Sequence, residues 1–214
     1  MTRAALLALV GALLVASPAT AQPDVGASRL ATGDLYPLPE RVFPSADGAG
    51  RTLAGEAGSG GLLVVFWSNT CPWAQRYSAR LADLAPRFAS AGVGMVLVNS
   101  NAPARLEAES AEATREKVAE AGIDAPVLLD DDGALARAFG ARHAPHAFLF
   151  GPDGHLRYDG AIDDSPSAAE RVDRAWLSEV LFPRADVVPA TRTPAFGCRL
   201  RLDAPPAPAP TPTP

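Results

Sequence analysis

Two cysteines are the side chains in this sequence best suited to chemistry. Cys71 follows the polar run Ser68-Asn69-Thr70 and precedes Pro72, at the expected junction between a buried strand and a long helix. A cysteine at the start of a helix lies near the positive end of the helix dipole, which stabilises the thiolate. Because the thiolate is the species that attacks disulfides, we expect Cys71 to be a reactive nucleophile.

The other cysteine, Cys198, lies near the end of the chain in a segment rich in proline and threonine. It is the only internal partner for Cys71, since the chain has two cysteines. The sequence leaves three states open: a redox-active disulfide with Cys71, a static disulfide that ties down the C-terminal segment, and two free thiols.

His143 and His146 flank the Ala144-Pro145 step. One imidazole beside a thiol stabilises the thiolate, and a thiol with two imidazoles suits a soft metal such as Cu(I) or Zn. Alternate side chains of a strand point to opposite faces, which argues against both histidines facing Cys71. We therefore treat Cys71, His143 and His146 as weak metal candidates and expect no cofactor.

The elements that must position these residues follow from the hydrophobic pattern. Apolar runs predict buried strands, and apolar residues spaced by three or four predict helices with one buried stripe. Strands are expected at about 62–67, 93–98, 127–129, 146–150 and 155–158, and helices at about 72–91, 109–121, 135–139 and 168–182. Pro86 is expected to kink or end the first of these helices early, and Gly92 closes the segment in either case. This order predicts an α/β fold with a mixed central sheet and helices on both faces.

The flanking segments divide the chain into five parts. Residues 1–21 have the basic start, apolar run and small-x-small site of a signal peptide, with an uncleaved membrane anchor as the alternative. An extended segment over 22–60, with one short strand, precedes the main domain at 61–183. A C-terminal extension over 184–203 carries Cys198, and the Pro-rich tail at 204–214 is expected to be disordered.

The charge distribution and the N-terminal segment limit the partners and the location that we expect for this protein. The formal net charge is −5 and the basic residues are scattered, which argues against a nucleic-acid partner. The signal peptide implies a periplasmic or secreted protein, with no stable membrane span after cleavage.

Several motifs resemble those of the thioredoxin-like redoxins, the superfamily that includes alkyl hydroperoxide reductase and thiol-specific antioxidant proteins. The similarity spans about residues 45–200 and is greatest for exported bacterial redoxins that have a Cys-Pro turn and a Gly-Cys near the C-terminus. The motifs are Phe66-Trp67-Ser68-Asn69-Thr70-Cys71-Pro72-Trp73, Asn99-Ser100-Asn101, Ala144-Pro145, Gly151-Pro152-Asp153-Gly154, the block 157–164 and Gly197-Cys198.

The resemblance implies roles for individual residues. Pro145 is expected to be the cis-proline that faces Cys71 in the thioredoxin-like fold. Cys71, Pro145 and Cys198 are the candidate catalytic residues, and either Cys198 or an external thiol would complete the cycle. Trp73, His143 and Ala144 are expected to contact the substrate, which would be a protein or small-molecule thiol or disulfide.

Three departures from the superfamily pattern matter. Ala74 stands where thioredoxins have their second cysteine. Ser68 and His143 stand where some similar redoxins have a resolving cysteine. The proline that peroxiredoxins have upstream of the active cysteine is Val64 here, which weakens a peroxidase interpretation.

Two hypotheses follow. In the first, the protein is an exported thiol oxidoreductase with antioxidant activity, in which Cys71 attacks a disulfide or a peroxide and Cys198 or an external thiol completes the cycle. In the second, it is a non-catalytic binding module that keeps the groove beside Pro145 for a partner or a metal.

Overall fold

The computed structural model describes residues 29–104 and 106–202. The predicted signal peptide and the Pro-rich tail at 204–214 lie outside these residues. Within the described part of the chain, no helix is both long enough and apolar enough to cross a membrane.

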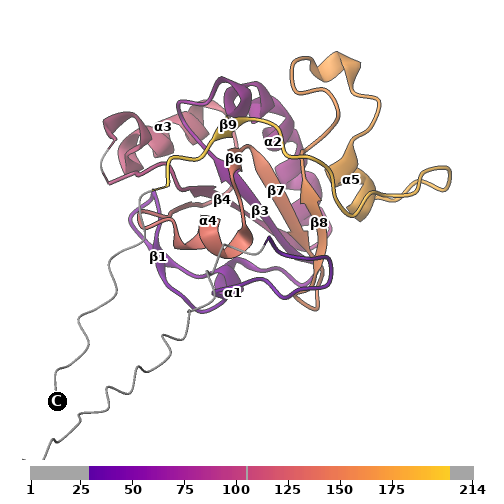
Figure 1. The fold of residues 1–214 in the computed structure, drawn as a ribbon, viewed down its shortest axis with the longest axis horizontal. Helices are drawn as coiled ribbons and strands as arrows, with labels where there is room; N and C mark the ends of the chain where they lie inside the picture. Colours follow the sequence, from indigo (N-terminus) through magenta and orange to yellow (C-terminus); the bar gives the residue numbers. More distant parts are fainter. Residues whose placement is uncertain (1–28, 105, 203–214) are drawn as a thin grey trace, which may run out of the picture.

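A mixed five-stranded sheet forms the centre of the molecule, as predicted (Figure 1). Its strands, in spatial order, are β5 (Val127–Leu129), β4 (Val93–Asn99), β3 (Gly61–Trp67), β7 (His146–Phe150) and β8 (Leu156–Gly160). The first three run parallel to one another, whereas β7 is antiparallel to β3 and β8 is antiparallel to β7. The predicted hairpin is therefore the β7–β8 pair.

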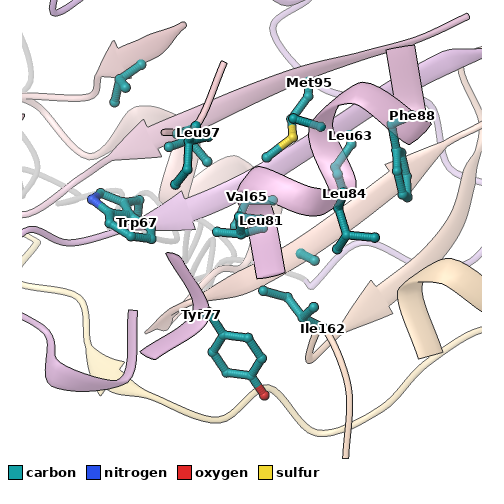
Figure 2. Close-up of a cluster of buried hydrophobic side chains, with 14 of the residues drawn as sticks. Leu63, Val65, Trp67, Tyr77, Leu81, Leu84, Phe88, Met95, Leu97 and Ile162 are labelled. Atoms are coloured by element: carbon teal, nitrogen blue, oxygen red, sulfur yellow. The ribbon is translucent and has the colours of Figure 1, made fainter. Parts of the chain in front are cut away.

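The central strand β3 is buried along its whole length because helices cover both faces of the sheet. Side chains alternate between the two faces, so Leu63, Val65 and Trp67 enter one core and Leu62, Val64 and Phe66 enter the other. Figure 2 shows the first core, in which the β3 residues meet residues of helix α2 and strand β4.

Helix α2 (Pro72–Ser90) covers one face of the sheet. Pro72 occupies the first turn, where its missing N–H costs nothing, and Gly92, at φ 73°, follows the end of the helix. The helix continues through Pro86 to Ser90, so Pro86 does not end it early. Leu84 and Phe88 on either side of Pro86 are buried and hold the last turns against the core.

Short elements complete the two layers. Helix α4 (Ala134–Phe139) lies on the opposite face of the sheet from α2 (Figure 1), and its Leu135 and Phe139 pack into the second core. Helix α3 (Ala111–Glu120) contributes Val118 to the first core. The other elements are β1 (Phe43–Pro44), β2 (Gly50–Arg51), α1 (Leu53–Glu56), a 3-10 turn at Glu107–Glu109, β6 (His143–Ala144), α5 (Trp176–Leu181) and β9 (Cys198–Arg199).

The last helix is shorter than predicted. Instead of one helix over 168–182, the chain forms a 3-10 turn at Ala169–Arg171 and then α5. Asp164 competes with helix formation, because its carboxylate accepts a hydrogen bond from the Asp173 N–H and its own N–H donates to the Arg174 carbonyl. The N-terminal segment also differs, since it pairs two short strands where one was expected.

An aromatic cluster centred on Phe139 lies in the second core. Phe139 is fully buried and makes edge-to-face contacts with Phe66, Phe148 and Phe150. We predict that Phe139→Ala lowers the free energy of unfolding by about 3–5 kcal/mol, measured by urea denaturation. Val188→Ala, at a position that is 88% exposed, should change it by less than about 0.5 kcal/mol, and an equal loss in both variants would contradict the assignment.

Candidate active site

Cys71 and Cys198 form a disulfide at the start of α2. Their Cα atoms are 5.8 Å apart although 127 positions separate them in the sequence. Cys71 is the N-cap residue of α2 and is 1% exposed, whereas Cys198 is half-buried in β9. Of the three states left open by the sequence, the structure excludes two free thiols and is compatible with either a redox-active or a static disulfide.

Strand pairing holds the segment around Cys198 in place. β9 pairs antiparallel with β6, which sets Cys198 opposite Ala144 and Arg199 opposite His143 (Figure 1). The Leu200 N–H donates to the carbonyl of Arg142 at 2.9 Å. These backbone contacts lie immediately beside the cysteine and do not involve its sulfur.

Further contacts anchor the segment on both sides of β9. Upstream, the Thr193 N–H donates to the Asp159 carbonyl at 3.0 Å, and its hydroxyl accepts from the Ala161 N–H. Downstream, the Arg201 N–H donates to Asn101 at 3.1 Å. The C-terminal extension is therefore part of the folded domain and not a free tail.

The peptide bond between Ala144 and Pro145 is cis, as the resemblance implied. The Cys71 Sγ atom lies 3.1 Å from the Ala144 carbonyl oxygen, so this step faces the disulfide. Gly197 crosses the same carbonyl so closely that a Cβ on it would lie 2.0 Å from the oxygen. Only glycine fits there, which explains the Gly-Cys pair.

Trp73 is half-buried and lies two positions after Cys71 in the sequence, and the aromatic residue that it contacts lies two positions before Cys198. Its ring makes an edge-to-face contact with Phe196 at 4.7 Å between centroids, and the Arg76 guanidinium lies 4.9 Å from its centre. Phe196 is 45% exposed, so an aromatic surface lies next to the cysteine pair. The predicted substrate residues Trp73 and Ala144 thus lie at the disulfide.

The two histidines have different surroundings. His143 is half-buried in β6, and burial together with the charges of Arg199 and Arg142 lowers its pKa. His146 is buried and its Nε2 lies 3.0 Å from the Asp159 carboxylate. The structure does not group the metal candidates: among the described residues, no three His, Cys, Asp or Glu side chains are placed to hold a metal ion.

Asp159 is a buried carboxylate that the sequence did not single out. It is fully buried and accepts hydrogen bonds from His146, Arg29 and Arg192. Burial alone would raise the pKa of Asp159, but the hydrogen bonds from His146 and Arg29 outweigh burial and hold the pKa below its usual value. Asp159 therefore remains ionised at neutral pH and fixes the ring of His146.

A second buried carboxylate, that of Glu109, organises the turn before Cys71. It accepts hydrogen bonds from the Ser68 hydroxyl at 2.7 Å, the Asn69 N–H at 2.9 Å and both the N–H and the hydroxyl of Thr70. The Asn99 amide, at the end of β4, donates to it at 3.0 Å. Glu109 is 1% exposed, so these donors replace the water that its charge has lost.

Sequence reasoning missed Glu109 because it lies about 40 positions from the turn that it binds and opens a charged stretch typical of a solvated helix. One signal was present. The polar residues Ser68-Asn69-Thr70 and Asn99 follow neighbouring parallel strands, whose carboxyl ends meet at one edge of a sheet, and buried donors there require an acceptor.

We predict that Glu109→Gln lowers the free energy of unfolding by about 2–4 kcal/mol, because the amide places a donor against donors in a buried site. Urea denaturation measures the loss, and hydrogen exchange at Asn69 and Thr70 should become faster. Glu116→Gln, at an exposed position of α3, is the matched control and should leave both quantities unchanged. Unaltered exchange at the turn in Glu109→Gln would refute this role.

Comparisons with known proteins agree with the geometry. A hypothetical protein from Sinorhizobium meliloti 1021 is 31% identical, with a TM-score of 0.70 over 83% of this chain and 97% of that one. An uncharacterized conserved protein from Geobacillus kaustophilus is 27% identical, with a TM-score of 0.71 over 83% of this chain and 94% of that one.

A more distant structure shares the fold. The peroxidoxin BcpB of Mycobacterium tuberculosis is 19% identical, with a TM-score of 0.53 over 71% of this chain and 94% of that one. None of the curated proteins compared with the chain matches it. The AhpC/TSA family model matches residues 37–159, which is more than half of the chain. With its thioredoxin-like fold and a cysteine at the start of the first long helix, the chain belongs to the AhpC/TSA family.

Proposed function

We propose that the protein is an exported thiol oxidoreductase in which Cys71 and Cys198 form a reversible redox pair. The observation that carries this proposal is their disulfide at the N-terminus of α2, beside the carbonyl of Ala144. Ala74 occupies the position of the usual second cysteine and is fully buried. Cys198 supplies the second sulfur from the other end of the chain.

The reaction is a thiol–disulfide exchange in two steps. The Cys71 thiolate attacks one sulfur of a substrate disulfide, a Cys71–substrate bond forms, and the other substrate sulfur leaves as a thiolate. The Cys198 thiolate then attacks the Cys71 sulfur, forms the Cys71–Cys198 disulfide and releases the second substrate thiolate. The substrate gains two electrons, and an external dithiol returns the protein to its reduced form.

The fold supports Cys198 as the resolving thiol. The contacts of β9 with β6, and those of Thr193 and Arg201, are made by groups other than the two sulfurs. When the bond is reduced, they keep Cys198 close to Cys71, so the second step is intramolecular and has a high effective concentration.

Helix α2 supports Cys71 as the attacking and leaving sulfur. Cys71 caps the helix and no side-chain acceptor occupies its first turn, so unpaired backbone N–H groups and the helix dipole favour a thiolate there. A low thiol pKa also makes Cys71 the better leaving group when a reductant attacks the less buried Cys198.

A disulfide substrate fits the chain better than a peroxide. Val64, which replaces the peroxiredoxin proline, is a fully buried core residue of β3. The aromatic pair of half-buried Trp73 and exposed Phe196 beside the cysteines suits contact with a protein or organic thiol.

Export and domain boundaries belong to the same proposal. A signal peptide at 1–21 delivers the chain to the periplasm or outside the cell, where a stable disulfide is chemically expected. The described contacts of β9 with β6 lead us to count residues 184–202 with the catalytic domain at 61–183 and not as an appendage.

A non-catalytic module is the second candidate. The same anchoring of β9 that would assist resolution also suits a static disulfide that fastens the C-terminal extension to the domain. The two functions differ in the reduction potential and in the reactivity of Cys71.

We predict that the disulfide has a reduction potential above about −300 mV, the approximate limit below which structural disulfides fall. Equilibration in dithiothreitol redox buffers, followed by alkylation and mass analysis, measures it. A potential below this value would identify a static clip and overturn the proposed redox cycle.

We further predict that Cys198→Ser traps the first step. Incubated with glutathione disulfide, this variant should accumulate a mixed disulfide at Cys71, because no internal thiol can resolve it. The wild-type dithiol should instead return to the Cys71–Cys198 disulfide. A Cys198→Ser protein that gains no glutathione at Cys71 would contradict a nucleophilic role.

The thiolate character of Cys71 can be measured directly. In Cys198→Ser, iodoacetamide should alkylate Cys71 several-fold faster at pH 7 in the folded protein than in urea, where the helix is lost. In Cys71→Ser, Cys198 is the control and should show no such acceleration on folding. Equal or slower labelling of folded Cys71 would count against the enzyme.

A further inference from the structure

A cavity of about 410 Å³ is lined in part by His143 and His146. Its walls come from three parts of the chain: Arg29, the stretch from Gly140 to His146, and the C-terminal extension just before Cys198. The lining residues are Arg29, Gly140, Arg142, His143, His146, Pro194 and Ala195. Its volume lies within the range of small-molecule sites.

The cavity is cationic in a protein whose formal net charge is −5. Arg29 and Arg142 both line it, and Arg199 lies close enough to lower the pKa of His143. Arg142 is exposed, and within the described part of the chain its guanidinium takes part in no ion pair. The buried carboxylate nearby, Asp159, is already bonded to Arg29, Arg192 and His146. The positive charge that remains favours an anion.

His146 adds a second, independent observation. Its side chain is 97% buried, since only 3% is exposed, and its Nδ1 has no hydrogen-bond partner. Asp159 is ionised and can only accept, so the His146 Nε2 carries the hydrogen of their 3.0 Å contact. Burial lowers the pKa of His146, which leaves the ring neutral and Nδ1 an acceptor. His146 lines the cavity, so this unpartnered buried acceptor lies close to the space that a ligand would occupy.

We propose that this cavity binds a small organic carboxylate that also carries a hydrogen-bond donor, such as a hydroxy acid or an amino acid. The carboxylate pairs with Arg142 at the open side, and the donor reaches the His146 Nδ1 directly or through a water. Gly140, Pro194 and Ala195 provide apolar walls for a short carbon chain, which a bare inorganic anion would leave unfilled. This binding site does not depend on the proposed redox chemistry.

Nuclear magnetic resonance titration of the full oxidised chain tests the proposal. Lactate and propionate are a matched pair of probes because they differ by one hydroxyl, and inorganic phosphate tests for a general anion site. The reporters are the His146 ring nitrogens and the backbone amides of residues 140–144, 146 and 195. Neither reporter depends on turnover, so failure of the redox cycle leaves this test intact.

We expect lactate to bind at least about fivefold more tightly than propionate and phosphate, and to shift the His146 Nδ1 resonance. Arg142→Gln should weaken lactate at least about fivefold, because a charge-assisted contact is lost. Arg171→Gln removes the same charge at another exposed position and should change nothing.

Four results would overturn the proposal. Equal affinity for lactate and propionate would exclude the donor, and tighter binding of phosphate would exclude an organic ligand. Equal weakening by Arg142→Gln and Arg171→Gln would mean that overall charge and not this cavity attracts the anion. Shifts confined to residues outside 140–146 and 195 would place the ligand elsewhere.

Discussion

The pairing of β9 with β6 is the interaction on which the rest of the site depends. It carries a cysteine from the end of the chain to the start of α2 and sets it opposite Ala144, across from Cys71. Without this short ladder the family's usual first cysteine would have no internal partner, since Ala74 cannot supply one. The pairing of β9 with β6 requires glycine at position 197, because any side chain there would collide with the Ala144 carbonyl.

Two buried carboxylates hold the surfaces that meet at the disulfide. Glu109 binds the turn that precedes Cys71, and Asp159 binds His146 directly after the cis-proline and Arg192 in the C-terminal extension. In both cases hydrogen-bond donors from the protein replace the water that a buried carboxylate lacks. Burial of each carboxylate is therefore favourable only when the segments that supply those donors are in place. The hydrogen bonds of these two buried carboxylates thus hold the segments that carry Cys71 and Cys198 in position.

The sequence predicted what depends on local pattern. Strand β3, helix α2 and the β7–β8 hairpin appear as apolar periodicity bounded by turn residues, and Cys71 appears as a helix cap. Contacts between distant segments have no such signature. Tertiary packing decides whether Cys198 meets Cys71 and which carboxylate binds the turn at Ser68. The last helix is shorter than its apolar spacing predicts, because the side chain of Asp164 binds backbone that the helix would use.

The central claim is that Cys71 and Cys198 are a reversible pair within one chain, and a non-reducing peptide mass map tests it most directly. We expect one linked peptide that contains both cysteines, which is lost after treatment with dithiothreitol and restored by glutathione disulfide. Two free thiols in the oxidised protein, or a linkage between different chains, would contradict it.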